Sequence, residues 1–253
     1  MEAETLVLEV PAGDLSVPRL ELPDWATRFG LTAGITTREG GFSLGLSSDD
    51  PAGQVMTRWG TFRRAFQPRF PSVVVSQQVH GTDVRWHNGV PSGWLLLDAV
   101  DGHGTRQAGV LLTITVADCI PVYLAAPASG VMLLLHAGWR GVAGGILERT
   151  LHDIEKEASV SMGELVMHCG VGICGNCYEV GSEVVERLAG SSGKGQTHVD
   201  LRAILAARAT ALGVGTVTVS AYCTAHHNDR FFSHRASGGR DGRMVAYLGR
   251  PLA

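Results

Sequence analysis

The sequence lacks a hydrophobic run long enough to cross a bilayer as a helix. Its most apolar region, residues 110–135, is interrupted by Asp118, Pro121 and Pro127. A membrane-spanning helix needs about 20 consecutive, predominantly apolar residues. The first five residues, MEAET, are acidic and lack the basic and apolar regions of a secretory signal. We therefore expect a cytoplasmic protein.

The sequence also lacks blocks of like charge, obvious repeats and a cysteine framework. Its 21 Lys and Arg nearly balance 24 Asp and Glu, and the formal net charge is −3. Such a balance gives no overall attraction to nucleic acid or to anionic lipid. The five cysteines are odd in number, in a chain too long to need a disulfide scaffold. We expect a reducing compartment, no nucleic-acid partner and no membrane partner.

What is present is a large apolar fraction, 45% of all residues, arranged in short β-branched and aliphatic runs. This is enough to bury a substantial core. Turn residues separate the runs, which predicts strands at residues 6–10, 31–37, 72–79, 84–87, 94–97, 110–116, 122–126, 131–136, 165–171, 214–222 and 244–248. The continuous apolarity of the three runs between residues 110 and 136 indicates strands covered on both faces, or on one face and by a second sheet.

Helical periodicity occurs between these runs. We expect a basic helix at 55–66, a long helix at 139–158, a short one at 180–188, and one that Asp200 caps and Gly213 ends. The glycines at 144 and 145 weaken the first half of the long helix. A flexible loop is expected at 190–195. Because strands and helices alternate without a break in composition, we predict one α/β (α+β) domain over residues 1–253 with a mixed sheet.

Three potential metal ligands stand at the ends of strand-like runs. His80 precedes a glycine, Cys119 precedes Ile-Pro, and His136 precedes Ala-Gly. Any one of them taken alone is more often a core residue, since free cysteine is among the most buried residue types. Polar groups at three such ends are costly unless something binds them, and strand ends of a mixed sheet can converge. Two imidazoles and one thiolate suit zinc and leave a fourth position open, as in catalytic zinc sites.

Further residues are candidates for binding substrate or phosphate. Arg140 lies four residues after His136, at the start of the expected long helix, where arginine and a helix N-terminus both favour phosphate; a surface ion pair is the alternative. Arg38 precedes two glycines that permit close approach of the backbone to an anion. Asp118 either orients a ligand or caps a strand end. Gln77 and Gln78 precede His80, and because side chains alternate along a strand only one of the two glutamines can face the site. We choose Gln78.

The remaining cysteines and histidines are weaker candidates for a functional site. Cys174 and Cys177 have the spacing of half a zinc ribbon, but no second cysteine pair lies at a suitable distance, and a thioredoxin-like context is lacking. Cys223 and the pair His226-His227 follow a strand. Adjacent histidines point in divergent directions, so we expect at most one of the two in a common site.

Together these segments resemble the YfiH family, whose members are variously named polyphenol oxidase (laccase-like), peptidoglycan editing factor and purine nucleoside phosphorylase. The matching segments run in family order through nearly the whole chain: 37–43 (TREGGFS), 77–83 (QQVHGTD), 98–101 (DAVD), 117–122 (ADCIPV), 136–141 (HAGWRG), 177–181 (CYEVG), 200–201 (DL), 223–224 (CT), 231–235 (FFSHR) and 242–244 (GRM). The Asp-Cys and His-Ala-Gly-Trp-Arg-Gly pieces are the most specific.

The resemblance implies layered mixed β-sheets flanked by helices, similar to the cytotoxic necrotizing factor deamidase. It implies zinc held by His80, Cys119 and His136, with copper as the less favoured metal. It also implies phosphorolysis of adenosine, inosine and methylthioadenosine, and deamination of adenosine. Purine nucleoside and phosphate are then the expected partners, bound by a monomer or small homo-oligomer.

Both implied reactions fit the candidate residues. In deamination, a water acidified by zinc attacks the purine C6 and ammonia leaves. In phosphorolysis, phosphate held by Arg38 and Arg140 attacks the ribose C1′ while the base leaves. Three loops depart from the family pattern, at residues 43–48, 57–58 and 172–177. Because these loops are expected to border the pocket, the metal ligands carry over better than the substrate preference.

Other functions stay open at this point. A metal-free hydrolase or deamidase would use Cys119 as nucleophile and His136 or His80 as base. A copper-dependent polyphenol oxidase needs many more paired histidines than the single pair at 226–227. Editing of peptidoglycan precursors and ligand sensing without turnover are the remaining alternatives.

Overall fold

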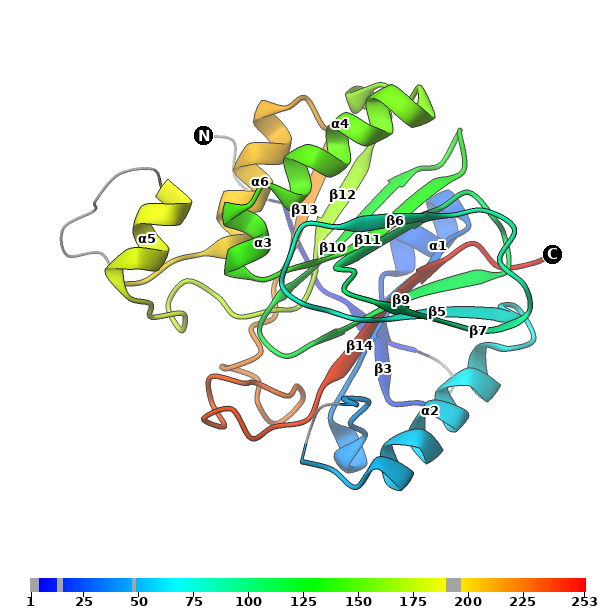
Figure 1. Ribbon diagram of the computed structural model, residues 1–253, viewed down its shortest axis with the longest axis horizontal. Helices are drawn as coiled ribbons and strands as arrows, with labels where there is room; N and C mark the ends of the chain where they lie inside the picture. The colour runs from blue at the N-terminus through cyan, green and yellow to red at the C-terminus, as the bar shows by residue number, and fades with distance from the viewer. Residues whose placement is uncertain (1–4, 13–15, 47–48, 190–196) are drawn as a thin grey trace.

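Two mixed β-sheets form the centre of the fold (Figure 1). The computed structural model describes residues 5–12, 16–46, 49–189 and 197–253. The first sheet has the order β1-β13-β12-β10-β11-β8-β6, with β1 (Thr5–Val7), β13 (Thr216–Ser220), β12 (Val166–Cys169), β10 (Ile120–Ala126), β11 (Val131–Ala137), β8 (Gly102–Thr105) and β6 (Val84–His87). The second has the order β2-β3-β4-β14-β9-β5-β7, with β2 (Val10–Pro11), β3 (Arg19–Glu21), β4 (Thr32–Thr36), β14 (Met244–Gly249), β9 (Val110–Val116), β5 (Ser72–Gln77) and β7 (Gly93–Asp98).

Helices cover the outer face of each sheet (Figure 1). The first sheet is covered by α3 (Trp139–Ala143), α4 (Ile146–Ala158), α5 (Ser182–Ala189) and α6 (Leu201–Ala211), and the second by α2 (Ala52–Phe66). A further short helix, α1 (Pro23–Phe29), packs against β4. The result is four layers, helix–sheet–sheet–helix, which confirms the predicted layering of mixed sheets flanked by helices.

The period-two alternation of strand side chains separates the cores between these layers. In β10, Val122 and Leu124 join the core beneath the helices, whereas Tyr123 and Ala125 join the core between the two sheets. The same alternation in β5 directs Val74 to the inter-sheet core and its two neighbours toward α2. Continuous apolar runs are therefore required in the central strands, because both faces of each strand are buried.

The predicted helix over 139–158 is wrong in one respect, because it is two helices. Helix α3 ends at Ala143, and α4 begins at Ile146 after Gly145, which has a φ of 80°. This left-handed conformation suits glycine and interrupts a right-handed helix. The predicted strand at 6–10 is likewise divided between β1 and β2, which belong to different sheets. The predicted loop at 190–195 lies outside the described residues.

Some elements were not anticipated from the sequence. Helix α1 begins at Pro23 and ends at Phe29, just before Gly30, whose φ is 66°. Proline at the start and glycine after the end are ordinary helix signals, but the helix of seven residues was too short to be recognised from them. Strand β8 has the sequence GHGT, and its two glycines have low β-strand propensity. It forms because β11 and β6 pair with it on both sides.

The connection from β9 to β10 carries the chain from the second sheet to the first. Strands β5 and β9 are parallel neighbours, so their carboxyl ends lie at one edge, which the 117–119 connection also reaches. Strand β11 runs antiparallel to β10, and its carboxyl end lies beside the start of β10. Residues that follow β5, β9 and β11 are thus brought together.

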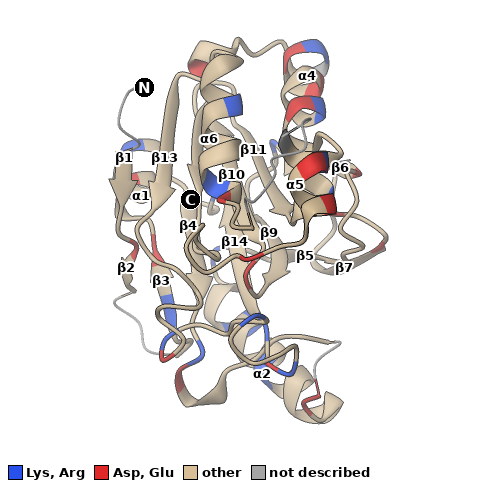
Figure 2. Cartoon of the chain, turned by 90° about the vertical axis from the view of Figure 1, so that its left-hand side faces the viewer, with Lys and Arg blue, Asp and Glu red and all other residues tan. Residues whose placement is uncertain are grey.

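The charged residues of α4 and α5 are mixed in sign, whereas those of α2 are all arginine, which confirms the predicted basic helix. Figure 2 shows acidic and basic positions interspersed along α4 and α5. None of the described helices combines the length and the apolarity that a bilayer span requires.

Candidate active site

The three predicted metal ligands converge where the two sheets meet. His80 lies shortly after the end of β5, and Cys119 directly precedes β10. His136 is the residue before the last one of β11. One ligand atom from each lies within 4.8 Å of the others. The two imidazole rings have centroids 4.8 Å apart and planes 73° apart. The structure therefore brings together side chains separated by up to 56 positions in the sequence (136 − 80).

A buried carboxylate, Asp101, organises two of these ligands. Its oxygens accept hydrogen bonds from the backbone N–H groups of Val79 (3.2 Å), His80 (2.9 Å) and Gly81 (2.7 Å). Oδ1 also lies 2.9 Å from Nδ1 of His136. A carboxylate only accepts, so this contact places a proton on Nδ1 and leaves Nε2 available as a ligand. Asp101 is fully buried, and the sequence interpretation did not assign it to the site.

The backbone on either side of the site adopts a left-handed conformation without glycine. His80 has a φ of 59° and Asp118 has a φ of 82°. Such conformations are uncommon for residues that carry a Cβ, cost of order 1–3 kcal/mol, and occur preferentially at functional sites. At His80 the three hydrogen bonds to Asp101 hold the turn in place, so the side chain is positioned by the fold itself.

The thiol and the imidazole alter each other's proton affinity. Burial alone raises the pKa of Cys119, but His136 and then His80 outweigh it and lower this pKa to about 6. Burial alone lowers the pKa of His136, but the Cys119 thiolate and the Asp101 carboxylate raise it to about 9. Opposite charges at short distance favour both charged forms. Without a metal, the pair is a thiolate beside an imidazolium at neutral pH.

Gly138 leaves the space that these side chains occupy. A Cβ at this position would lie 2.9 Å from Cδ2 of His80 and 3.0 Å from Sγ of Cys119. Its φ of −77° is accessible to any residue, so the need for glycine is steric rather than conformational.

A cavity of about 790 Å³ opens beside the three ligands. This volume is within the usual range for small-molecule sites, roughly 300–1,000 Å³. His80, Cys119 and His136 line it together with the predicted residues Gln78, Asp118 and Arg140. All predicted site residues except Arg38 thus border one cavity.

Gln78 and Asp118 are both engaged by protein groups. Oε1 of Gln78 accepts from the backbone N–H of Thr115 at 2.7 Å, and its Nε2 donates to the carbonyl of the same residue at 2.8 Å. Asp118 accepts from the Thr224 hydroxyl at 2.6 Å and from the backbone N–H of Arg235 at 2.6 Å. Gln78 therefore clamps β5 to β9, and Asp118 ties the C-terminal loops to the cavity.

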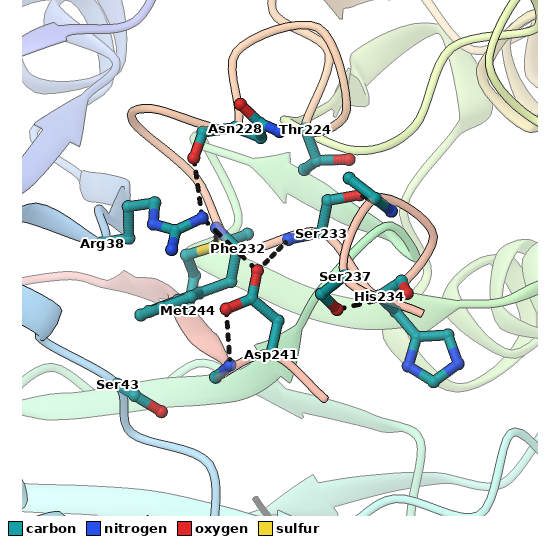
Figure 3. Close-up of polar contacts among 12 residues, drawn as sticks. Arg38, Ser43, Thr224, Asn228, Phe232, Ser233, His234, Ser237, Asp241 and Met244 are labelled. Atoms are coloured by element: carbon teal, nitrogen blue, oxygen red, sulfur yellow. Dashed lines mark hydrogen bonds and ion pairs between the residues drawn. The ribbon is translucent and has the colours of Figure 1, made fainter. Parts of the chain in front are cut away.

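Arg38 lies outside the cavity lining, in a network with the loop at 228–244 (Figure 3). Its Nη1 donates to the carbonyl of Asn228 at 2.7 Å and lies 3.4 Å from Oδ2 of Asp241. The guanidinium carbon is 5.0 Å from the centroid of the Phe232 ring, within the range of a cation–π contact. The two glycines after Arg38 suggested an anion site, but the partners of its guanidinium come from the protein.

The cavity contains cationic and aromatic groups that the sequence interpretation did not assign. Tyr178, His234, Arg235 and Arg243 line it. The guanidinium carbon of Arg235 lies 5.2 Å from the Tyr178 ring centroid. Burial raises the pKa of Tyr178 to about 12, so its hydroxyl keeps its proton at neutral pH. All four residues lie in family-like segments noted above, namely 177–181, 231–235 and 242–244.

The ligand set fits zinc. Two imidazoles and a thiolate are its usual ligands, and the Asp101 carboxylate orients His136 as such carboxylates orient zinc-bound histidines. The same arrangement, Cys119 beside His136 beside Asp101, also fits a thiol nucleophile with an oriented base. Geometry alone thus allows two kinds of chemistry at this site.

The chain is similar in sequence to several known proteins. A family model described as multi-copper polyphenol oxidoreductase laccase matches residues 32–251. The chain is 32% identical over 248 residues to purine nucleoside phosphorylase YlmD of Geobacillus stearothermophilus, covering 87% of this chain and 90% of that protein. It is 34% identical over 252 residues to a purine nucleoside phosphorylase of Deinococcus radiodurans, covering 93% and 94%. It is also 31% identical over 160 residues to adenosine deaminase RL5 of an unknown prokaryotic organism, covering 58% and 61%.

Solved structures share the fold over almost the entire chain. The crystal structure of YlmD from Geobacillus stearothermophilus superposes with a TM-score of 0.85 at 28% identity, covering 96% of this chain and 100% of that one. The crystal structure of the Bacillus licheniformis hypothetical protein YfiH superposes with a TM-score of 0.83 at 23% identity, covering 94% and 98%.

Proposed function

Because this chain belongs to the YfiH family, we propose that it is a zinc-dependent purine nucleoside phosphorylase with adenosine deaminase activity. One observation carries the proposal. His80, Cys119 and His136 present three ligand atoms within 4.8 Å of one another on the wall of a cavity that arginines also line. The arginines suit an anionic group such as phosphate, and the metal ligands suit a second group on which a bound metal acts. Residues 1–253 act as one domain in this proposal.

The proposed metal ligands are His80, Cys119 and His136, with Asp101 as their support. When bound, zinc supplies Lewis-acid chemistry at an open coordination position. The chain contributes the rest: Asp101 holds the proton on Nδ1 of His136 and fixes the turn that carries His80. Copper is the less favoured metal, since copper oxidases use more histidines than this site offers.

Phosphate binding is assigned to the arginines of the cavity. Arg140 is exposed at the cavity wall, with its guanidinium carbon 4.4 Å from the Trp139 ring centroid. Arg235 and Arg243 line the same cavity. Guanidinium groups bind phosphate oxygens in a fixed geometry, which orients the nucleophile toward the ribose C1′. We assign Arg38, Gln78 and Asp118 to positioning the loops and strands that carry these groups.

Nucleoside binding is assigned to the apolar and aromatic part of the lining. Leu96 is 69% exposed although it is apolar, and it lines the cavity together with Trp139 and Tyr178. Such surfaces bury the flat face of a purine. The protonated Tyr178 hydroxyl can donate a hydrogen bond to a ring nitrogen or a sugar oxygen.

Turnover of adenosine with and without phosphate tests the proposal. We expect chromatography to show adenine and ribose 1-phosphate only when phosphate is present, and inosine from the deaminase reaction in either case. Cys119→Ala should lower both rates by about 10³-fold or more, because it removes a ligand on which the site depends. Cys169→Ala, which removes a thiol from the helix-side core, should retain both rates per folded molecule. Equal rates in wild type and Cys119→Ala would contradict the proposal.

A metal-free thiol hydrolase or deamidase is the second candidate, favoured by the Cys119–His136–Asp101 arrangement. In that function Cys119 attacks the substrate and His136 donates a proton to the leaving group. Chelation separates the two candidates. Activity that survives complete metal removal supports the thiol enzyme, and activity that is lost and then restored by zinc supports the phosphorylase.

A further inference from the structure

A second group of metal-ligating side chains lies apart from the three ligands described above. Cys174, Cys177, Cys223 and His226 each offer one ligand atom, and these atoms all lie within 4.8 Å of one another. None of the four lines the cavity. We refer to these residues as the four-residue cluster.

Parallel strand pairing brings the four-residue cluster together. Strands β12 and β13 are parallel neighbours, so the segments that follow them leave the same edge of the first sheet. An isolated bridge between Gly172 and Cys223 continues that ladder, and the backbone N–H of Thr224 donates to the carbonyl of Gly172 at 3.1 Å. The C-x-x-C segment after β12 is thereby placed against the C-x-x-H segment after β13.

The thiols and the imidazole of the four-residue cluster are in direct contact. Sγ of Cys177 lies 3.2 Å from a ring nitrogen of His226, and Sγ of Cys174 lies 3.6 Å from the other ring nitrogen. The backbone N–H of Cys174 donates to Sγ of Cys223 at 3.3 Å. The C-x-x-C segment is a tight turn, in which the backbone N–H of Cys177 donates to the carbonyl of Cys174 at 3.0 Å. All three cysteines are free thiols.

The ligand atoms of the four-residue cluster are close enough for a tetrahedral zinc site, because they all lie within 4.8 Å of one another. With Zn–S distances of about 2.3 Å, the ligand atoms of a tetrahedron lie roughly 3.8 Å apart. Three thiolates and one imidazole fill all four positions, which is the pattern of a structural zinc rather than a catalytic one. Soft thiolate ligands also select zinc over harder divalent cations.

We propose that Cys174, Cys177, Cys223 and His226 bind a structural zinc ion that joins the loop after β12 to the loop after β13. The consequence for the cavity is direct, because both loops reach it. Ile173 and Tyr178 flank the C-x-x-C segment and line the cavity. Thr224, next to Cys223, donates to the carboxylate of Asp118. The ion fixes these residues without contacting substrate, and its binding does not depend on the function proposed above.

Zinc stoichiometry tests this site independently of activity. Untagged protein grown with zinc and dialysed against metal-free buffer should contain about two zinc ions per chain, one for each cluster. Cys177→Ser and His226→Ala should each lose one of the two, whereas His226→Cys, which restores a fourth soft ligand, should keep both. Cys119→Ser should lose the other ion and leave the four-residue cluster loaded. Cys169→Ala is the matched control and should keep both.

Cobalt substitution protects the test against variants that fold poorly. Cys119→Ala loaded with Co²⁺ should show the intense thiolate charge-transfer and tetrahedral visible bands of a three-sulfur site, and Cys119→Ala/Cys177→Ser should lose them. Two results would overturn the proposal. The first is that Cys119→Ser abolishes all bound zinc. The second is that alkylation and mass spectrometry of freshly purified wild type find Cys174 and Cys177 joined in a disulfide.

Discussion

The two cysteine–histidine clusters differ in how the chain assembles them. The ligands His80, Cys119 and His136 come from both sheets, and a buried carboxylate and a left-handed backbone fix their positions. The four-residue cluster comes from two adjacent loops of one sheet and is held by a tight turn and a single bridge. The first cluster faces the cavity and, in the proposed zinc site, leaves one coordination position open, whereas the proposed second site fills all four positions with protein ligands. A site with an open coordination position needs surrounding residues to hold its ligands in place, whereas in a site with four protein ligands the metal itself holds them together.

The largest expected contrast concerns the acidity of Cys119. In metal-free protein its pKa of about 6, against about 8.5 for an ordinary thiol, should make alkylation by iodoacetamide reach its plateau above pH 7. Below pH 6 the rate should fall about tenfold per pH unit, because only the thiolate reacts. His136→Gln removes the main charge that stabilises the thiolate, so the midpoint should move upward by more than one pH unit.

Peptide mass spectrometry of samples quenched at a series of pH values gives this profile. Cys177, whose pKa burial and then the neighbouring Cys174 raise to about 12, is the internal comparison and should react roughly 100-fold more slowly at pH 7 while its loop stays folded. A midpoint near 8.5 for Cys119 in the wild type would remove the basis for the thiolate–imidazolium pair.

A smaller effect is expected when the support of the open site is weakened. Asp101→Asn keeps the shape of the side chain but replaces one acceptor oxygen with a donor, so it cannot accept from three backbone N–H groups and His136 together. Zinc affinity of the first cluster and kcat/KM should each fall by about 10–100-fold. Competition with a chelating dye measures the affinity.

Asp153→Asn on α4 is the control for the loss of a carboxylate. Zinc in the four-residue cluster should be unchanged in both variants. If Asp101→Asn bound zinc at the first cluster as tightly as the wild type, the supporting role assigned to this carboxylate would be wrong.

The smallest expected effect comes from crowding the open site by one methyl group. Gly138→Ala places a Cβ within 3.0 Å of both His80 and Cys119, so one of these ligands must move by a few tenths of an ångström. We expect kcat/KM to fall by about tenfold, since misplacing a reacting group is costly. The melting temperature should change by only a few degrees. Gly53→Ala in α2, with no atom within 4 Å of the added Cβ, should leave activity at the wild-type level.

Much of the fold could be predicted from residue patterns because burial on both faces leaves a clear signal. The central strands β9, β10 and β11 were identified within a few residues, since each is a continuous apolar run between turn residues. Strand β8 was not, because its glycines leave room for Leu133 and Leu135 of β11 rather than contributing side chains. Its formation depends on partners that lie elsewhere in the sequence.

The candidate site was partly predictable for a similar reason. His80, Cys119 and His136 stand out because a polar residue at the end of an apolar run is costly unless it is used. Asp101 gives no such signal, since its importance lies in the four groups that donate to it after folding. The four-residue cluster was overlooked because Cys174 and Cys223 are 49 residues apart, and only the parallel pairing of β12 with β13 makes them neighbours.

The left-handed backbone at His80 and Asp118 limits how these two positions can change over evolutionary time. Asparagine and glycine tolerate that conformation, but neither supplies an imidazole or a carboxylate. Valine and isoleucine tolerate it poorly and supply no ligand. A substitution at either position must therefore both adopt the left-handed backbone and supply the required side-chain group. His80 is exposed, yet it accepts far fewer replacements than other exposed residues do.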